Sequence, residues 1–279
     1  MILGHEKTVL DLKRLADKGG LSHGYVFFGP RGVGKKLVAL SLAGYLESGV
    51  FEERKMLYDC LLIVPDEKRT IGIDAARSLK GFLWQKPNVG SRRVAVIDQA
   101  ELMTEEAQNA LLRITEEPPP SALLILVTQD IESLKYTLAS RFQKIYFSII
   151  PREEIAVWLI NDLSLAKGNA ENIAKRSFGK PGLAYALVKD KEFGKLLKLA
   201  ESVMLAGAAT RRDLIKKVMA DDKFNLEVFL DAVIILAAEW KSDSETKMKF
   251  WHKMLNLRGK AQYLNLNPRL QLESLFFNS

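Results

Sequence analysis

The sequence predicts an α/β domain with a parallel sheet, followed by two smaller helical domains. Short, continuous apolar runs alternate with helix-like segments over the first half of the chain, which is typical of parallel strands buried on both faces. A glycine-rich turn joins the first of these runs to a helix. The strand-like runs stop at Pro151, and only helical periodicity continues beyond it. We therefore expect domains at residues 1–150, 151–190 and 191–279.

Each predicted element rests on its own pattern of apolar residues. The strands are expected at Tyr25–Phe28, Leu61–Val64, Val94–Ile97, Leu123–Val127 and Ile145–Phe147. The helices of the first domain are expected at Lys7–Lys18, Leu37–Leu46, Ile73–Trp84 and Thr104–Thr115, with Tyr136–Ser140 as a segment that flanks a strand. Beyond Pro151, helices are expected at Pro151–Leu163, Ala170–Phe178, Pro181–Val188, Phe193–Leu205, Arg211–Met219, Asn225–Trp240 and Thr246–Leu257.

The bulk composition is that of an ordinary globular protein. The 279 residues are 48% hydrophobic and 27% charged, and no apolar run approaches the ~20 residues that cross a bilayer. The N-terminus lacks the layout of a signal peptide, so we expect a cytoplasmic protein. The single cysteine, Cys60, excludes an intrachain disulfide. The net charge of +7 permits contact with nucleic acid without requiring it.

The glycine-rich turn has the sequence of a phosphate-binding loop that lacks its last residue. Gly29, Gly32, Gly34 and Lys35 stand at the spacing of such a loop, in which backbone N–H groups and a helix N-terminus face an anion. The lysine reaches the outer phosphates, and a neighbouring Ser or Thr hydroxyl holds Mg²⁺. Lys36 occupies that hydroxyl position, and an ammonium has no acceptor to bind a cation. A turn that binds nothing remains the alternative interpretation.

A second part of a nucleotide site follows the third predicted strand. In P-loop enzymes an Asp at this place orients Mg²⁺, and a following Glu activates the attacking water; Asp98 fits the first role, but Gln99 stands where the Glu is needed. Gly29, Asp98 and Thr128 each come just after a predicted strand. Because ligands bind at the carboxyl ends of parallel strands, we expect these three residues at one rim of the sheet.

Five ordered motifs between residues 22 and 147 resemble one family. They are Ser22-His23-Gly24-Tyr25-Val26-Phe27-Phe28-Gly29-Pro30-Arg31-Gly32-Val33-Gly34-Lys35, Val96-Ile97-Asp98-Gln99-Ala100-Glu101-Leu102-Met103, Ala107-Gln108-Asn109-Ala110-Leu111-Leu112-Arg113, Glu116-Glu117-Pro118-Pro119 and Thr137-Leu138-Ala139-Ser140-Arg141-Phe142-Gln143. Their order and spacing resemble those of the delta prime subunits of the bacterial DNA polymerase III clamp loader. These are AAA+ proteins in which a P-loop α/β domain is followed by a helical lid domain and a C-terminal helical collar domain.

The resemblance implies a role for each matching residue. Gly29–Lys35 matches the nucleotide loop, Asp98 the acid of the second motif, and Thr128 the polar sensor after the fourth strand. Arg141 matches the arginine of the family's Ser-Arg-Cys motif, which is offered to the ATP of the neighbouring subunit. Phe142 replaces the cysteine, but the arginine carries the charge. The implied function is that of a non-hydrolysing subunit that helps load the sliding clamp on primed DNA.

Three departures from the family concern nucleotide chemistry: Lys36, Gln99, and Leu183 near the place of a sensor arginine. They imply a subunit of the polymerase holoenzyme with no ATPase or polymerase activity by itself, and they leave open whether ATP binds without turnover. Between Glu47 and Cys60 only the cysteine could bind zinc, so we expect no zinc and assign no metal ligand.

The implied partners are other clamp-loader subunits in a hetero-oligomeric ring, the sliding clamp and, through the complex, primed DNA. The C-terminal helices from about Lys191 are expected to drive ring assembly, because they carry apolar stripes that include Phe229, Val233, Ile234 and Leu236. Two alternatives stay open. The chain could be an ATP-hydrolysing motor subunit of the same superfamily, or a DNA-binding module on an AAA+ scaffold.

Overall fold

The computed structural model describes residues 2–52, 56–219, 224–239, 245–263 and 266–277. The chain divides into two compact units, Met1–Ala184 and Tyr185–Ser279. We describe each unit by itself. The finer division into domains at residues 1–150, 151–190 and 191–279 stays a prediction.

The first unit contains a five-stranded, fully parallel sheet in the order β2-β3-β4-β1-β5. Its strands are β1 (Gly24–Phe28), β2 (Cys60–Ile63), β3 (Arg93–Ile97), β4 (Ala122–Thr128) and β5 (Gln143–Tyr146). The predicted parallel sheet is therefore confirmed, with strand boundaries within about two residues of the apolar runs. The interior strands β1, β3 and β4 are buried almost throughout, whereas β5 lies at an edge and is mostly exposed.

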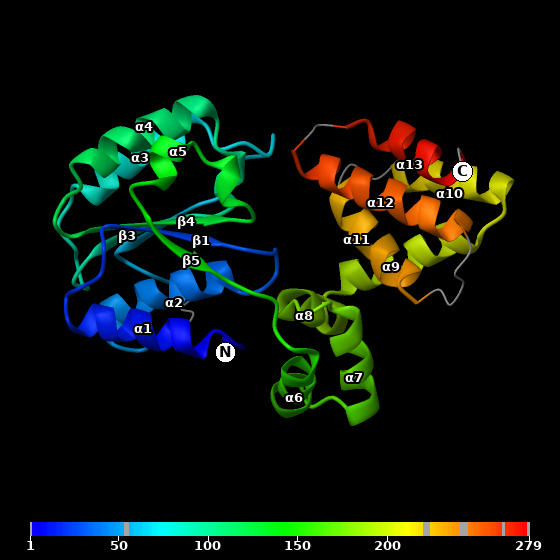
Figure 1. Cartoon of the computed structure of the whole chain (residues 1–279), viewed down its shortest axis with the longest axis horizontal. Coiled ribbons are helices and arrows are strands. Elements are labelled where there is room, and N and C mark those ends of the chain that lie inside the picture. The colour runs from blue at the N-terminus through cyan, green and yellow to red at the C-terminus, as the bar shows by residue number, and fades with distance from the viewer. Residues whose placement is uncertain (1, 53–55, 220–223, 240–244, 264–265, 278–279) are drawn as a thin grey trace. The chain divides into compact units, whose positions relative to one another are not determined.

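Successive side chains of each interior strand enter two different cores. On β4, Leu123 and Ile125 belong to the core shared with the N-terminal helices, and Leu124 and Leu126 belong to the opposite core. Figure 1 shows the resulting layers, with helices below and above the sheet. The lower pair is α1 (Glu6–Asp17) and α2 (Lys35–Ser48); the upper helices are α3 (Ile73–Leu83), α4 (Glu105–Glu116) and α5 (Tyr136–Ala139).

Helix α5 forms where the sequence predicted only a segment that flanks a strand. It is one short turn, and two 3₁₀ turns, η1 (Ala100–Leu102) and η2 (Ile131–Ser133), were also not predicted. The longer helix α4 begins as expected, because the Thr104 side chain accepts a hydrogen bond from the Ala107 N–H and so caps its N-terminus.

Three helices follow the sheet. Helices α6 (Arg152–Leu163) and α7 (Lys167–Arg176) pack against each other, and α8 (Pro181–Lys189) begins in the first unit and continues into the second. Gly179 joins this part to the sheet, because its carbonyl accepts the N–H of Ile150 at 2.8 Å. Among the described helices, none is both long and apolar enough to span a membrane.

The second unit is helical and has its own core. It contains α9 (Lys191–Leu205), α10 (Ala208–Met219), α11 (Leu226–Ala237), α12 (Glu245–Tyr263) and α13 (Pro268–Phe277). Helix α13 was not predicted, and Trp240, expected within a helix, lies outside the described residues.

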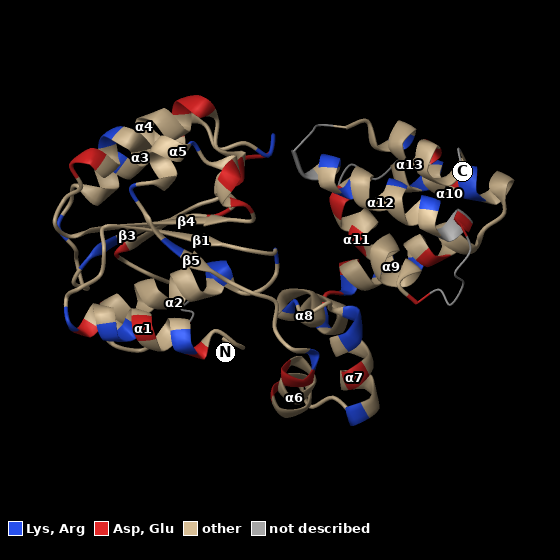
Figure 2. Ribbon diagram, viewed as in Figure 1, with Lys and Arg blue, Asp and Glu red and all other residues tan. Residues whose placement is uncertain are grey.

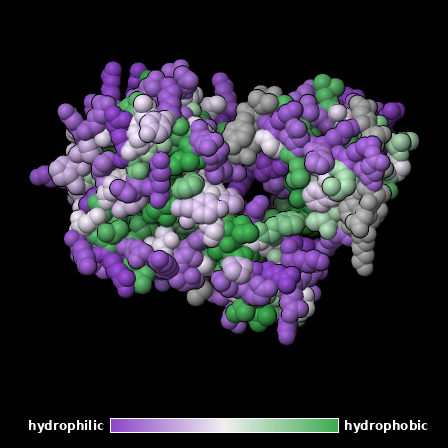
Figure 3. Space-filling view, viewed as in Figure 1, coloured by the Kyte–Doolittle hydropathy of each residue, from purple (hydrophilic) through white to green (hydrophobic). Residues whose placement is uncertain are grey.

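The apolar stripe that was expected to bind other subunits lies inside this core, so that reason for an assembly role was wrong. Phe229 and Val233 are fully buried among the unit's own helices, and Ile234 and Leu236 pack against them. Other apolar side chains do remain exposed, including Leu205 at 74% and Leu270 at 61%. Figure 3 shows hydrophobic residues in green at the surface.

Candidate functional site

The glycine-rich loop connects the end of β1 to the start of α2. Gly29, Gly32 and Gly34 have φ values of 133°, 83° and 107°, a region that side chains other than glycine rarely adopt. Gly29 also lies close to the backbone that follows β5, because a Cβ there would clash with the Phe147 carbonyl oxygen. Glycine is therefore required at this position both for its conformation and for the space it leaves.

Lys35 is buried and holds the loop together from inside. Its Nζ donates hydrogen bonds to the carbonyl oxygens of Gly29 and Pro30, each at 2.6 Å. Because an ammonium has three N–H donors, one remains for an anion in the loop. Burial lowers the pKa of Lys35 to about 8, although the nearby carboxylates of Glu101 and Asp98 oppose this effect.

Lys36, which replaces the metal-binding hydroxyl, forms an ion pair with Asp98. Its Nζ lies 3.1 Å from Oδ2 of Asp98, and the other carboxylate oxygen, Oδ1, accepts the backbone N–H of Gln99 at 3.1 Å. Both oxygens of the acid therefore have partners within the protein. Within the described ranges, no group of three or more His, Cys, Asp or Glu side chains is placed to hold a metal ion.

Two other polar groups lie at the same rim of the sheet. Thr128 is paired in register with Phe28, but its hydroxyl donates to the Asp130 carbonyl at 2.9 Å and so serves the local turn. Glu101, which the sequence analysis did not single out, accepts from Gln129 through Oε1 at 3.1 Å. Its Oε2 is buried without a hydrogen-bond partner among the described residues.

The start of α8 covers the loop from another side. The N–H of Gly182 donates to the Gly32 carbonyl at 2.9 Å, and Leu183, noted for the missing sensor arginine, follows directly. Lys180 also lies beside Gly32, and its charge contributes to the lowered pKa of Lys35. The segment at the start of α8 thus brings the cation of Lys180 to the loop, at a different position from the sensor arginine of the family pattern. The sequence did not indicate that Lys180 lies next to the loop.

His5, which received no role from the sequence, lies against the loop as well. Its Nε2 is 3.2 Å from the Val33 carbonyl oxygen, and its ring meets the Phe147 ring edge-on at a centroid distance of 4.8 Å. Burial lowers the pKa of this imidazole. The neutral ring that results is well suited to a partly buried packing position.

Arg141 lies at the opposite end of the sheet from the loop. It precedes the first residue of the edge strand β5, and Gln143 is paired with Tyr25 at the beginning of β1, whereas the loop follows the end of β1. Its Nη2 lies 3.2 Å from Oε1 of Glu116 at the end of α4, and its Nη1 donates to the Thr137 carbonyl. The structure therefore brings Gly29, Lys35, Asp98 and Thr128 to one rim and separates Arg141 from them.

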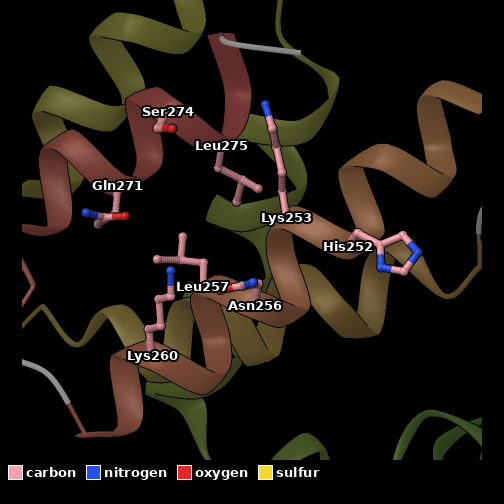
Figure 4. Close-up of a pocket in the computed structure, with 8 residues that line it drawn as sticks. All are labelled: His252, Lys253, Asn256, Leu257, Lys260, Gln271, Ser274 and Leu275. Carbon is pink, nitrogen blue, oxygen red and sulfur yellow. The ribbon is translucent and has the colours of Figure 1, made fainter.

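Cys60 and the hollow of the second unit lie apart from the predicted site residues. Cys60 begins β2, and burial raises the pKa of its thiol to about 12. Figure 2 shows acidic and basic residues mixed along α1 and α4. A hollow of about 340 Å³ lies between α12 and α13 in the second unit. Figure 4 shows its residues, with the His252 ring pointing away from the others, and none of them is a predicted site residue.

Comparison with known proteins relates the chain to subunits of DNA polymerase III. Residues 4–151, just over half of the chain, match the family described as "DNA polymerase III, delta subunit". Over 130 residues the chain is 32% identical to the DNA polymerase III subunit delta′ of Escherichia coli strain K12; the match covers 46% of this chain and 39% of that protein. The chain thus matches less than half the length of this relative.

Two solved structures share the fold. The first is a DNA polymerase III gamma subunit-related protein of Thermotoga maritima, with a TM-score of 0.66 and 24% identity over 96% of this chain and 97% of that one. The second is the RuvB Holliday junction branch migration motor of the same organism, with a TM-score of 0.52 and 19% identity over 91% and 77%. At these identities the likeness concerns the fold alone, a parallel α/β sheet with helices followed by a helical region. Because the family match covers more than half of the chain, the chain belongs to the DNA polymerase III delta subunit family.

Proposed function

We propose that this chain is a non-hydrolysing AAA+ subunit of a DNA polymerase III clamp loader, and that it supplies Arg141 to the ATP of a neighbouring subunit. The position of Arg141 carries the proposal. Because β1 and β5 are parallel and in register, Arg141 and the chain's own loop lie beyond opposite ends of the same strands. A strand of five residues spans roughly 17 Å, so this arginine serves a nucleotide outside its own chain.

The surroundings of Arg141 support an arginine that can be recruited. Its guanidinium is partly exposed and makes an ion pair with the exposed carboxylate of Glu116. Such exposed pairs contribute only about 0–1 kcal/mol, so a nucleotide phosphate can replace Glu116. Guanidinium presents a fixed fork of donors that suits phosphate oxygens, and phosphoryl transfer builds charge that such a cation stabilises.

The chain's own loop supports the non-hydrolysing part of the proposal. Lys36 cannot bind Mg²⁺, Asp98 is committed to Lys36 and to the Gln99 N–H, and the Gln99 amide cannot accept a proton. The partners would be other clamp-loader subunits in a ring, with the sliding clamp and primed DNA reached through the complex. A role of the C-terminal helices in assembly stays a prediction. The apolar stripe of Phe229, Val233, Ile234 and Leu236 does not support it, because these residues pack within the second unit.

The test is the steady-state ATPase of the reconstituted complex, stimulated by clamp and primed DNA. Arg141→Ala should leave the complex assembled in co-elution and reduce its hydrolysis by about 10³-fold or more at the affected site. Arg77→Ala is the matched control, because Arg77 is also an exposed arginine paired with a carboxylate, that of Asp74 at 3.3 Å. Hydrolysis at the wild-type rate from an intact Arg141→Ala complex would refute the proposal.

A further inference from the structure

The ion pair between Lys36 and Asp98 stands where this fold places a divalent cation. Lys36 is the second residue of α2 and directly follows the loop lysine, at the position whose hydroxyl binds Mg²⁺ in a phosphate-binding loop. Asp98 follows β3, at the position of the acid that orients the same ion. Their side chains meet at 3.1 Å. One ammonium therefore bridges the two positions that a metal ion otherwise joins.

The residues present do not fit Mg²⁺. The ion demands near-ideal octahedral coordination by oxygen atoms at about 2.0–2.1 Å. Lys36 has no acceptor to offer, and both oxygens of Asp98 already accept hydrogen bonds or an ion pair from within the chain. An ammonium at this place would also repel a second cation.

The anion-binding half of the loop is retained. Lys35 keeps one of its three donors after its two bonds to the Gly29 and Pro30 carbonyls. The positive φ values of Gly29, Gly32 and Gly34 maintain the loop conformation, and α2 begins directly behind it. Only one of the three Lys36 donors is needed for Asp98, so two N–H groups can face a phosphate.

We propose that the Lys36 ammonium takes the place of the divalent cation, so that this loop binds a nucleoside polyphosphate in its metal-free form. The Mg²⁺ complex of the nucleotide is then excluded, because its metal would occupy the place of the ammonium. The inference concerns the chain's own loop and holds independently of whether Arg141 serves a neighbour.

The test measures binding of ATP that carries a fluorescent N-methylanthraniloyl group to the full-length chain, with EDTA and again with millimolar MgCl₂. The wild-type chain should bind the probe in EDTA, and millimolar Mg²⁺ should weaken the apparent affinity, because it converts the free nucleotide into the excluded Mg²⁺ complex. Binding that needs Mg²⁺, or that is as tight in Mg²⁺ as in EDTA, would overturn the proposal. An absence of binding under both conditions would also overturn it.

Two variants locate the effect. Lys36→Thr supplies the missing hydroxyl and frees Asp98, so its affinity should increase by about tenfold or more when Mg²⁺ replaces EDTA. Lys7→Thr is the matched control, because Lys7 is also the second residue of a helix, α1, and is exposed far from the loop in sequence; it should bind as the wild type does. If Lys36→Thr, still folded by circular dichroism, binds the probe no more tightly in Mg²⁺ than in EDTA, Lys36 is not the substitute for the cation.

Discussion

The backbone N–H of Gly182 donates to the carbonyl of Gly32 at 2.9 Å, so the first turn of helix α8 contacts the glycine-rich loop directly. A Cβ at Gly182 would lie 3.1 Å from the Gly32 carbonyl oxygen and 3.3 Å from its Cα. Both distances are tighter than ordinary van der Waals contact. The close approach of the two backbones therefore depends on glycine at position 182.

The first prediction is that Gly182→Val separates helix α8 from the loop. The added methyl groups should cost about 1–3 kcal/mol of unfolding free energy in urea denaturation, because overpacking forces backbone shifts. Amide exchange should accelerate at residue 182, whose hydrogen bond to Gly32 is lost. Gly168→Val is the control, because Gly168 is also the second residue of a helix, α7, and its Cβ would meet nothing within 4 Å. Equal effects of the two substitutions would contradict the prediction.

The second prediction concerns the pH dependence of anion binding. Burial lowers the pKa of Lys35 to about 8, with Arg31 and Lys180 acting in the same direction and Glu101 and Asp98 opposing it. A phosphate binds the protonated ammonium, so affinity should be constant below this pKa. It should fall by up to about tenfold for each pH unit above it.

The stability of the fold changes with pH in the opposite direction to the affinity for phosphate. The pKa of Lys35 in the folded chain lies below the value of about 10.4 for an unfolded lysine, so its contribution to folding becomes more favourable between about pH 8 and about pH 10.4. A loss of nucleotide binding above pH 8 therefore cannot come from unfolding through Lys35. Titration of the fluorescent nucleotide in EDTA from about pH 7.5 to about pH 9.5 checks the prediction, and a flat profile would contradict it.

The third prediction concerns Asp59, which holds the start of β2. Its buried carboxylate accepts the N–H groups of Asn88, Val89 and Gly90 and pairs with Arg93 at 3.2 Å. Burial alone would raise the pKa of this carboxyl, but the three N–H donors and Arg93 together hold it below its ordinary value.

Removing this charge should strongly destabilise the chain. Asp59→Asn leaves the buried Arg93 without its counter-ion, and breaking such a pair costs about 3–5 kcal/mol. In the wild type, this stabilisation is present above about pH 4 and is lost as the pH falls through the depressed pKa of the folded state. Urea denaturation measures both effects. Asp74→Asn, which removes the exposed partner of Arg77, should change stability by less than about 1 kcal/mol; an equally mild Asp59→Asn would contradict the prediction.

The sheet could be predicted from the sequence because a parallel strand covered on both faces is apolar at consecutive positions, as β3 and β4 are. Helix α13 was missed although its pattern was present: it begins at Pro268, which suits a first helical position, and buries Leu272 and Leu275. The first apolar run and the spacing of the glycines also predicted the position of the loop, between β1 and α2.

The contacts that define the site could not be predicted in the same way. The sequence identified Lys36 as the loss of a hydroxyl, but its ion pair with Asp98 joins residues far apart in the chain. The same holds for Lys180 and His5, which reach the loop from other elements. A local pattern records which groups are present at the loop, whereas only the folded chain shows what they contact.

The fourth prediction is that the isolated chain does not hydrolyse ATP above background in the presence of Mg²⁺. The reason is the combined loss of a metal-binding hydroxyl at Lys36 and of a carboxylate base at Gln99. Phosphate release from the purified chain is the measurement, with Lys35→Ala as the control for contaminating activity. Turnover that disappears in Lys35→Ala would mean that the loop is an active ATPase site and that the chain is a motor subunit.

The last prediction concerns Glu116, which pairs with Arg141, the residue that we propose to contact a neighbour's nucleotide. The guanidinium must leave this carboxylate, 3.2 Å away, to reach a neighbour's nucleotide. Glu116→Gln weakens this exposed pair, which contributes about 0–1 kcal/mol. The stimulated ATPase of the reconstituted complex should therefore rise, by up to about fivefold at subsaturating ATP.

Two further variants separate competition from positioning. Glu153→Gln removes another exposed carboxylate that pairs with an arginine, Arg152 at 2.7 Å, and should leave the ATPase unchanged. Glu116→Gln combined with Arg141→Ala should be as slow as Arg141→Ala alone, because the carboxylate acts only through the arginine. A tenfold fall in Glu116→Gln, with assembly intact, would instead mean that Glu116 orients Arg141 toward the phosphate. In that case the ion pair would persist while Arg141 contacts the nucleotide, and Glu116 would not compete with the phosphate.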